Sequence, residues 1–345
     1  MKTILQMFGL TTALLIAASA CLGAEKQKAQ KQTITYPTIG TIERHDPRLD
    51  QLIAPGAKIE KLAEGYSWSE GPVWISRGGY LLFSDVPRNS VFKWMEGEGA
   101  SAYLANSGYT GATPRGGEPG SNGLTVDSSG RLVLCEHGNR RVSRLNRQGF
   151  ETLAQYYEFH RLNSPNDLVF KSNGDLYFTD PPYGLEGNNA DPKKELLFNG
   201  VYRVDKKGAV TLLTSKLTFP NGLAFSPDEK TLYVANSDPK WAIWMAFEVS
   251  DDGTLGENRV FFDATAMAKD KPGMPDGLKV DRAGNLFATG PGGVLIFSPE
   301  GIHLGTLSTG EPTANCAWGN DGSMLYITVN HWLCRIQTTT KGKIP

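Results

Sequence analysis

The sequence predicts an all-β protein, a six-bladed β-propeller whose last blade is closed by a strand from the N-terminal part of the chain. Three observations predict it. A short motif recurs six times, and short strands of alternating apolar and polar residues follow each copy. The last copy also lacks one strand, and a matching strand stands before the first copy. Repeats of this length, built from short strands, are typical of propellers and solenoids.

The repeated motif is an oxygen-bearing residue, usually followed by glycine, which opens a short strand. A turn and a second strand follow, as in the stretch from Asn221 to Asn236. The copies recur at intervals of roughly 40–55 residues. Their first residues are Glu70, Asn122, Asn166, Asn221, Asp276 and Asn315.

The first 24 residues have the form of an export signal. Lys2 supplies the positive end, residues 4–20 are mostly apolar, and Ala18-Ser-Ala20 is a small-residue cleavage pattern. The apolar run is short for a membrane span. We therefore expect an exported protein, periplasmic or secreted. Cys21, directly after Ala20, also permits a lipoprotein form held to the membrane through an acylated cysteine.

Residues 25–57 are rich in Lys and Gln and then in Pro, which predicts a tether that becomes ordered near Ile53. The propeller is expected over residues 58–340. Residues 58–63 have the same form, and the same place relative to the next motif, as the outer strand at 210–214. We expect them to complete the last blade, because closing the ring removes an exposed sheet edge.

Each blade is expected to continue outward with a third and a fourth strand, because similar stretches follow each motif. The third strands are expected at 89–94, 141–145, 200–204, 242–246, 293–297 and 332–336. Fourth strands at 149–154 and 209–214 are examples of the outermost position. No stretch predicts a long helix.

Charge and cysteine content exclude some classes of function. The chain has 35 basic and 36 acidic residues, a net charge of -1, which argues against a nucleic-acid-binding surface or a polybasic membrane patch. Cys135, Cys316 and Cys334 are expected to be buried free thiols. Cys316 and Cys334 fall on strands of the last sheet that should not be adjacent.

The six motif residues should meet around the central axis, because inner strands line the axis of a propeller. All six carry oxygen, two as carboxylates and four as amides, a donor set that suits Ca²⁺ or Mg²⁺ better than zinc. Asn-Gly and Asp-Gly are also common turn dipeptides, so any single copy also fits a turn. The dipeptide opens a strand here, however, and Glu70 keeps the oxygen without the turn preference. The set therefore predicts one divalent cation.

Strand two of each blade should end on the face where strand one begins, since the two strands are antiparallel. These ends are expected to form a polar mouth above the ion that binds substrate. The candidates for substrate binding are Asn122, Glu136, His137 and Tyr183. His137 could act as an acid, a base or a substrate donor. It could equally be a structural histidine.

Several motifs together resemble the SMP-30/gluconolactonase family, over roughly residues 44–337. They are Glu70-Gly-Pro-Val-Trp74, Ser164-Pro-Asn-Asp-Leu168, Pro220-Asn-Gly-Leu223 and Pro275-Asp-Gly-Leu278. The stretches 135–142 and 177–184 are similar to the bacterial gluconolactonase branch of that family.

The resemblance implies a six-bladed propeller with divalent-metal-dependent lactonase activity on a sugar lactone such as glucono-1,5-lactone. It implies Glu70, Asn221 and Asp276 as metal ligands and Asn166 as a ligand or substrate contact. Asp276 would be the general base, with Asn166 beside it in the catalytic site. Ca²⁺ is the preferred metal, with Mg²⁺, Mn²⁺ or Zn²⁺ as alternatives. The export signal departs from the cytosolic members of the family.

Two other functions remain open at this point. A phosphotriesterase-like hydrolase could use the same metal site. A non-catalytic binding propeller is the second alternative, because the unit that ends in Asn139-Arg-Arg-Val142 resembles an NHL repeat. Glu70 and Asp276 among the axial amides favour a hydrolase, since a binding propeller has no need of buried carboxylates there.

Overall fold

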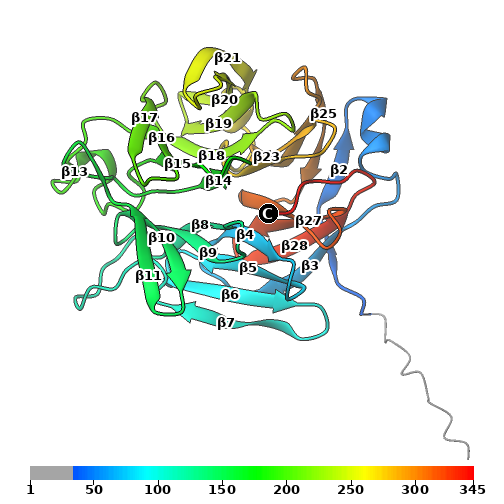
Figure 1. Ribbon diagram of the computed structural model, residues 1–345. Helices are drawn as coiled ribbons and strands as arrows, with labels where there is room; N and C mark the ends of the chain where they lie inside the picture. The colour runs from blue at the N-terminus through cyan, green and yellow to red at the C-terminus, as the bar shows by residue number, and fades with distance from the viewer. Residues whose placement is uncertain (1–33) are drawn as a thin grey trace, which may run out of the picture. The chain divides into compact units, whose positions relative to one another are not determined.

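Six antiparallel sheets stand as blades around a central axis in the computed structural model, which describes residues 34–345 (Figure 1). Residues 36–345 form one unit, and in each blade the strands follow one another from the axis outward. The prediction of a six-bladed propeller is confirmed.

The first three blades each contain four consecutive strands. Blade 1 contains β4 (Ser69–Ile75), β5 (Tyr80–Asp85), β6 (Ser90–Met95) and β7 (Gly99–Ala105). Blade 2 contains β8 (Ser121–Val126), β9 (Leu132–Glu136), β10 (Arg141–Asn146) and β11 (Gly149–Ala154). Blade 3 contains β14 (Leu168–Phe170), β15 (Leu176–Asp180), β16 (Gly200–Val204) and β17 (Val210–Thr214).

The remaining blades keep this order, and the last has three strands of its own. Blade 4 contains β18 (Pro220–Phe225), β19 (Thr231–Asp238), β20 (Trp241–Val249) and β21 (Leu255–Asp263). Blade 5 contains β22 (Leu278–Val280), β23 (Leu286–Gly290), β24 (Gly293–Phe297) and β25 (His303–Ser308). Blade 6 contains β26 (Thr313–Gly319), β27 (Met324–Val329) and β28 (Trp332–Gln337). Outside the blades lie the hairpin β12 (Tyr156–Tyr157) and β13 (His160–Arg161), with 3-10 turns η2 (Asn188–Ala190) and η3 (Met267–Lys269).

The N-terminal strand β3 (Ile59–Glu64) completes blade 6. It pairs antiparallel with β28, with Leu333 opposite Ala63 and Arg335 opposite Glu60. The Arg335 guanidinium also donates to the Glu60 carboxylate at 2.7 Å, which reinforces the join. The predicted closure is confirmed, and the edge of β28 is covered rather than exposed to other chains.

Residues 36–57 differ from the expectation of a tether. The strand β1 (Thr38–Ile39) pairs with β3 on the outside of blade 6, and β2 (Thr41–Arg44) pairs with β25 on the outside of blade 5. Gly40 joins them with φ 60°, and a Cβ there would lie 1.9 Å from the Ser308 carbonyl oxygen. The 3-10 turn η1 (Pro47–Gln51) then buries Leu49 between the two blades. The sequence did not indicate these strands, because two short edge strands bury few side chains and therefore need few apolar residues.

The core lies between neighbouring blades. In the part of the chain that the structure describes, one buried apolar cluster fills each junction around the ring. The junction between blades 6 and 1 includes Leu62 of β3 beside Trp74 and Tyr326. Ring closure therefore buries apolar surface as well as pairing strands.

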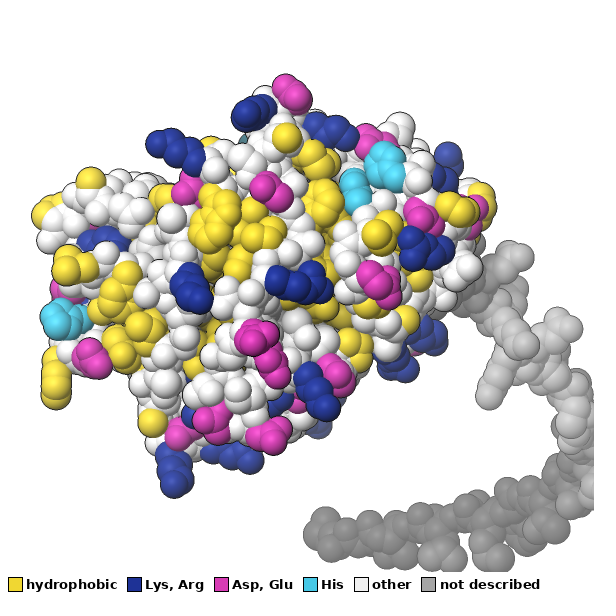
Figure 2. All heavy atoms as spheres, turned by 90° about the horizontal axis from the view of Figure 1, so that it is seen from above, with side chains coloured by type: hydrophobic (Ala, Val, Ile, Leu, Met, Phe, Trp, Pro, Cys, Tyr) yellow, Lys and Arg dark blue, Asp and Glu magenta, His cyan; other side chains and the backbone are white. Residues whose placement is uncertain are grey.

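Cys135, Cys316 and Cys334 are buried free thiols, as predicted. Cys316 and Cys334 lie on β26 and β28, on either side of β27. The proposed export signal lies outside the described residues. No helix within residues 34–345 is long and apolar enough to cross a membrane. On the rim of the ring that is uppermost in Figure 1, basic and acidic side chains are interspersed with apolar ones (Figure 2).

Candidate metal centre and its mouth

The six motif residues lie at the starts of the inner strands, at one end of the central axis. Four are the second or third residue of a strand, and Asn166 and Asp276 lie two residues before one. Consecutive inner strands contact one another around the ring, from β4 through β8, β14, β18 and β22 to β26. Five of the six side chains are buried, and Asp276 is partly buried. These contacts between inner strands bring the six motif residues together at the axis.

The glycines of the motif permit this close approach. A Cβ on Gly71 would lie 2.0 Å from the Asn122 carbonyl oxygen, and one on Gly222 would lie 2.3 Å from the Asp276 carbonyl oxygen. Only glycine lets neighbouring inner strands come so near. The Asn-Gly and Asp-Gly pairs therefore mark strand contacts at the axis, and the reading of each copy as a hairpin turn is wrong.

Four side-chain oxygens at this end of the axis are buried and have no hydrogen-bond partner within the described residues. They are Oδ1 of Asn122, Asn166, Asn221 and Asp276. The amide nitrogen of Asn221 donates to Ser237 Oγ at 3.0 Å, and that of Asn166 lies 3.4 Å from His137 Nε2. Because the nitrogens are held elsewhere, the oxygens remain available to a cation.

The pKa values of the axial carboxyl groups are raised, because these groups are buried close to one another. Burial raises the pKa of Glu70 to about 8, and the Asp167 carboxylate adds to the rise. Burial and the neighbouring Glu70 also raise the pKa of Asp276 well above its usual value. Like charges buried together favour the protonated form, and a divalent cation would relieve this repulsion.

Asp167 is a third axial carboxylate that the sequence interpretation missed. It stands where the other repeats have glycine or Cys316. The Asn315 amide donates to Asp167 Oδ2 at 3.4 Å and to Glu70 Oε2 at 3.3 Å. Asn315 Oδ1 accepts from the Cys316 backbone, so this amide links two carboxylates and offers no free oxygen. The presence of Asp in the third repeat, at a position where most repeats have Gly, is the sequence feature that could have indicated this carboxylate.

The donor set is mixed rather than purely acidic. Within residues 34–345, no three His, Cys, Asp or Glu side chains are gathered as a metal site of their own. The axial group instead combines Glu70 and Asp276 with the unpartnered amide oxygens of Asn166 and Asn221. Hard oxygen donors of this kind, half of them charged and half neutral, fit Ca²⁺ best among common cations.

His137 and Tyr183, two of the predicted substrate-binding residues, lie beside the axial group. His137 is fully buried, with Nδ1 3.4 Å from Glu118 Oε2 and Nε2 facing the Asn166 amide. The Tyr183 ring stacks on Phe219 with centroids 5.9 Å apart, and its buried hydroxyl has no partner among the described residues. Burial raises the pKa of this hydroxyl, which stays a neutral donor.

The connection 106–120 between β7 and β8 also reaches the mouth. It carries Glu118, and the Arg115 guanidinium donates to the Gly184 carbonyl next to Tyr183. Arg115 lies over the Tyr109 ring at 5.5 Å. Neither Glu118 nor Arg115 was singled out from the sequence, because this connection belongs to no repeated motif.

Glu136 does not join the axial group. Its carboxylate accepts from Arg141 Nε at 2.9 Å, from Asn139 Nδ2 at 2.5 Å and from Ser143, all in its own blade. Both of its carboxylate oxygens therefore already accept hydrogen bonds within blade 2.

Other strand-two ends hold the backbone that leads into the inner strands. Asp85 accepts from the Trp68 backbone N–H, and Asp180 from those of Asn163 and Ser164. These carboxylates therefore stabilise the backbone around the mouth through hydrogen bonds.

Comparison with known proteins adds to this geometry. The family model described as SMP-30/Gluconolactonase/LRE-like region matches residues 68–331. The chain is 39% identical to the gluconolactonase of Zymomonas mobilis over 341 residues, 95% of this chain and 94% of that protein. It is 27% identical to the pentonolactonase of Haloferax volcanii over 267 residues, 75% of this chain and 80% of that protein.

Solved structures that resemble this chain include members of the same family. A gluconolactonase from Xanthomonas campestris has a TM-score of 0.76 at 31% identity, covering 89% of this chain and 99% of that one. The calcium-binding protein regucalcin from Agrobacterium tumefaciens has a TM-score of 0.66 at 18% identity, covering 82% and 95%. The second likeness is evidence for the fold alone.

Proposed function

The chain belongs to the SMP-30/gluconolactonase/LRE-like family, and we propose that it is a divalent-metal-dependent lactonase. The proposed substrate is a sugar lactone such as glucono-1,5-lactone, hydrolysed to the aldonic acid. One observation carries the proposal: buried carboxylates and unpartnered amide oxygens converge at the axis, next to a polar mouth. The 39% identity to a gluconolactonase along almost the whole chain supports it.

Glu70, Asn166, Asn221 and Asp276 would hold the cation. Two carboxylates balance the charge of a divalent ion, and the two amides add neutral oxygens. Ca²⁺ fits this set, with Mg²⁺, Mn²⁺ or Zn²⁺ as alternatives. When bound, the cation supplies positive charge that polarises the lactone carbonyl and favours negative charge on its oxygen.

The chain's own residues would position the reactants and move protons. Asp276 is the proposed acceptor of the proton from the attacking water, since its buried Oδ1 has no partner in the described structure. Water adds to the carbonyl carbon, the ring C–O bond breaks, and the ring oxygen takes a proton to become the hydroxyl of the product acid. Asn122, His137 and Tyr183 offer polar atoms to the sugar hydroxyls.

A chelation experiment tests the proposal. A panel of aldonolactones is assayed before and after treatment with chelator, and then after addition of Ca²⁺, Mg²⁺, Mn²⁺ or Zn²⁺. We expect hydrolysis to be lost on chelation and restored by at least one cation. A phosphotriester is assayed in parallel.

Full lactonase activity after exhaustive removal of metal would contradict the metal dependence. Phosphotriester hydrolysis without lactone hydrolysis would favour the related hydrolase instead. Binding of aldonolactones without turnover under any cation would favour a non-catalytic propeller.

A further inference from the structure

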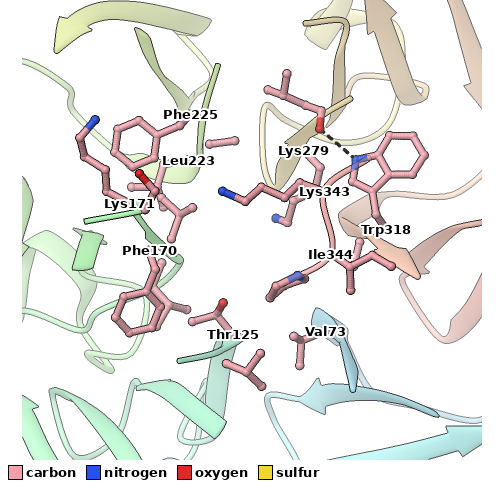
Figure 3. Close-up of a pocket in the computed structure, with 18 of the residues that line it drawn as sticks. Val73, Thr125, Phe170, Lys171, Leu223, Phe225, Lys279, Trp318, Lys343 and Ile344 are labelled. Carbon is pink, nitrogen blue, oxygen red and sulfur yellow. Dashed lines mark hydrogen bonds between the residues drawn. The ribbon is translucent and has the colours of Figure 1, made fainter. Parts of the chain in front are cut away.

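A second cavity opens at the other end of the central axis. Its volume is about 560 Å³, within the range of roughly 300–1,000 Å³ usual for small-molecule sites. All six inner strands contribute to it with their later residues, and the C-terminal residues Lys343–Pro345 line it too. Figure 3 shows Lys343 and Ile344 among the lining side chains. Inner strands run in the same direction in every blade, so this cavity and the candidate metal centre face opposite sides of the ring.

One charged residue interrupts an otherwise uncharged ring in this cavity. The third residue after each axial residue lines it in every repeat. These residues are Val73, Thr125, Val169, Ala224, Lys279 and Trp318. Figure 3 shows the Lys279 side chain extended toward the middle of the cavity. Phe170, Phe225 and Ile344 add further apolar surface.

Four of the five other basic residues that line the cavity form ion pairs with acidic side chains, and Arg282 is the exception within the described residues. Arg131 and Arg144 lie within 3.0 Å of the Asp127 carboxylate. Lys171 and Lys343 share Glu229 at 3.6 Å and 3.5 Å.

Lys279 Nζ donates to the Leu278 carbonyl oxygen at 2.9 Å. Within residues 34–345, no carboxylate lies within ion-pair distance of it. The Asp167 carboxylate of the axial group interacts with the Lys279 charge without forming an ion pair with it. An ammonium group without a paired carboxylate favours an anion beside it, because partly buried charge is costly unless paired.

We propose that this cavity binds a small amphipathic carboxylate, with the carboxylate on Lys279 and an apolar body against Phe170, Phe225 and Trp318. The Lys279 ammonium, which forms no ion pair, matches one carboxylate, and the aromatic part of the lining matches an apolar body. A sugar lactone or an aldonate has no apolar body for Phe170, Phe225 and Trp318 to contact. The site is therefore distinct in ligand class from the one at the opposite end.

The test is direct binding, measured by isothermal titration calorimetry with 4-phenylbutyrate. Its uncharged and cationic counterparts, 4-phenylbutanol and 4-phenylbutylamine, serve as ligand controls, and gluconate as the polar carboxylate. The variant Lys279→Met removes the charge and keeps an unbranched side chain. The matched control is Lys216→Met, at an exposed residue outside the cavity.

We expect one saturable site for 4-phenylbutyrate that persists in chelator. Lys279→Met should weaken it about tenfold or more, as loss of a hydrogen bond to a charged group does, while Lys216→Met leaves it unchanged. The alcohol, the amine and gluconate should bind more weakly than the acid. Absence of saturable binding, or equal affinity of the acid and the alcohol for the parent protein, would overturn the proposal.

The comparison between acid and alcohol uses the parent protein alone. It therefore tests the preference for a carboxylate even if Lys279→Met does not fold. Because binding is the readout, a protein without lactonase activity could still bind the carboxylate. Failure of this proposal is thus distinguishable from failure of the proposed function.

Discussion

Asp276 differs from the other axial residues in combining a carboxylate with a buried oxygen that has no partner among the described residues. Glu70 also carries a carboxylate, but its Oε2 already accepts from the Gly71 backbone at 2.8 Å and from Asn315. Glu70 is therefore held in place before any cation binds, whereas Asp276 remains free to take part in proton transfer.

The variant Asp276→Asn should keep the shape and one oxygen while removing the charge and the base. We expect kcat/KM for aldonolactones to fall about 100-fold or more, the usual contribution of a positioned general base. The melting temperature should not fall, because the change removes a charge that burial disfavours. Steady-state kinetics and thermal melts measure both. Asp251→Asn, at an exposed residue beyond the end of β20, is the control, and an unchanged rate in Asp276→Asn would show that the chemistry happens elsewhere.

Cation binding should release protons at neutral pH. The pKa of Glu70 is raised to about 8 by burial, so this carboxyl is mostly protonated at pH 7 in the metal-free protein. A bound divalent cation requires the ionised form, so affinity should increase as the pH rises from 6 to 8. Calorimetry in two buffers of different ionisation enthalpy counts the protons. Glu70→Gln should bind more weakly and release fewer, and a proton count of zero for the parent protein would contradict this account.

At the scale of single elements, the inner strands have almost no free space between them. Gly71, Gly123 and Gly222 lie against the backbone of the next repeat, and Gly277 lies against the Asn315 side chain. The role of these glycines is therefore steric rather than one of turn formation. The distance between inner strands also sets how near the axial oxygens come to one another.

Gly222→Ala should be strongly destabilising. Its new Cβ would lie 2.3 Å from the Asp276 carbonyl oxygen, and a backbone atom cannot move away as a flexible side chain can. We expect a loss of about 1–3 kcal/mol in the free energy of unfolding, typical of overpacking, measured by denaturant melts. Gly56→Ala is the matched control, because nothing lies within 4 Å of its added Cβ. Equal stability of the two variants would mean that inner strands are not packed this tightly.

The strand β3 closes the ring, so its removal should open it. A chain that lacks residues 1–64 exposes the edge of β28 and loses Ile59 and Leu62 from two blade junctions. We expect this chain to aggregate or to lose its cooperative melt. A chain that lacks only residues 1–33 should melt like the full-length protein. Circular dichroism melts and light scattering distinguish these outcomes, and a cooperative transition in the shorter chain would refute closure by β3.

At the scale of the whole molecule, we propose that the chain is exported, to the periplasm or beyond, and that its signal is removed. The mature protein should begin after Ala20 or Ala24, and intact mass spectrometry of the exported fraction reads this directly. A diacylglyceryl group on Cys21 would establish the lipoprotein form. A chain that starts at residue 25 should remain inside the cell, and an exported protein that retains Met1 would refute cleavage.

Four features could be predicted from the sequence alone: the number of blades, the position of most strands, the closure by β3 and the six axial residues. Each of these depends on a pattern that is local in the chain and repeated along it. Alternation of apolar and polar residues specifies a strand, and equivalent positions in a repeat must meet at a shared axis.

Which axial oxygens lack a hydrogen-bond partner could be seen only in the folded protein, because the orientation of an amide depends on partners far away in sequence. His137 holds the Asn166 nitrogen, and Asn315 is held between Glu70 and Asp167. Glu136 is paired within its own blade for the same kind of reason. The cavity around Lys279 also arises only when six strand ends are brought together, since no single repeat contains enough of its lining to indicate it.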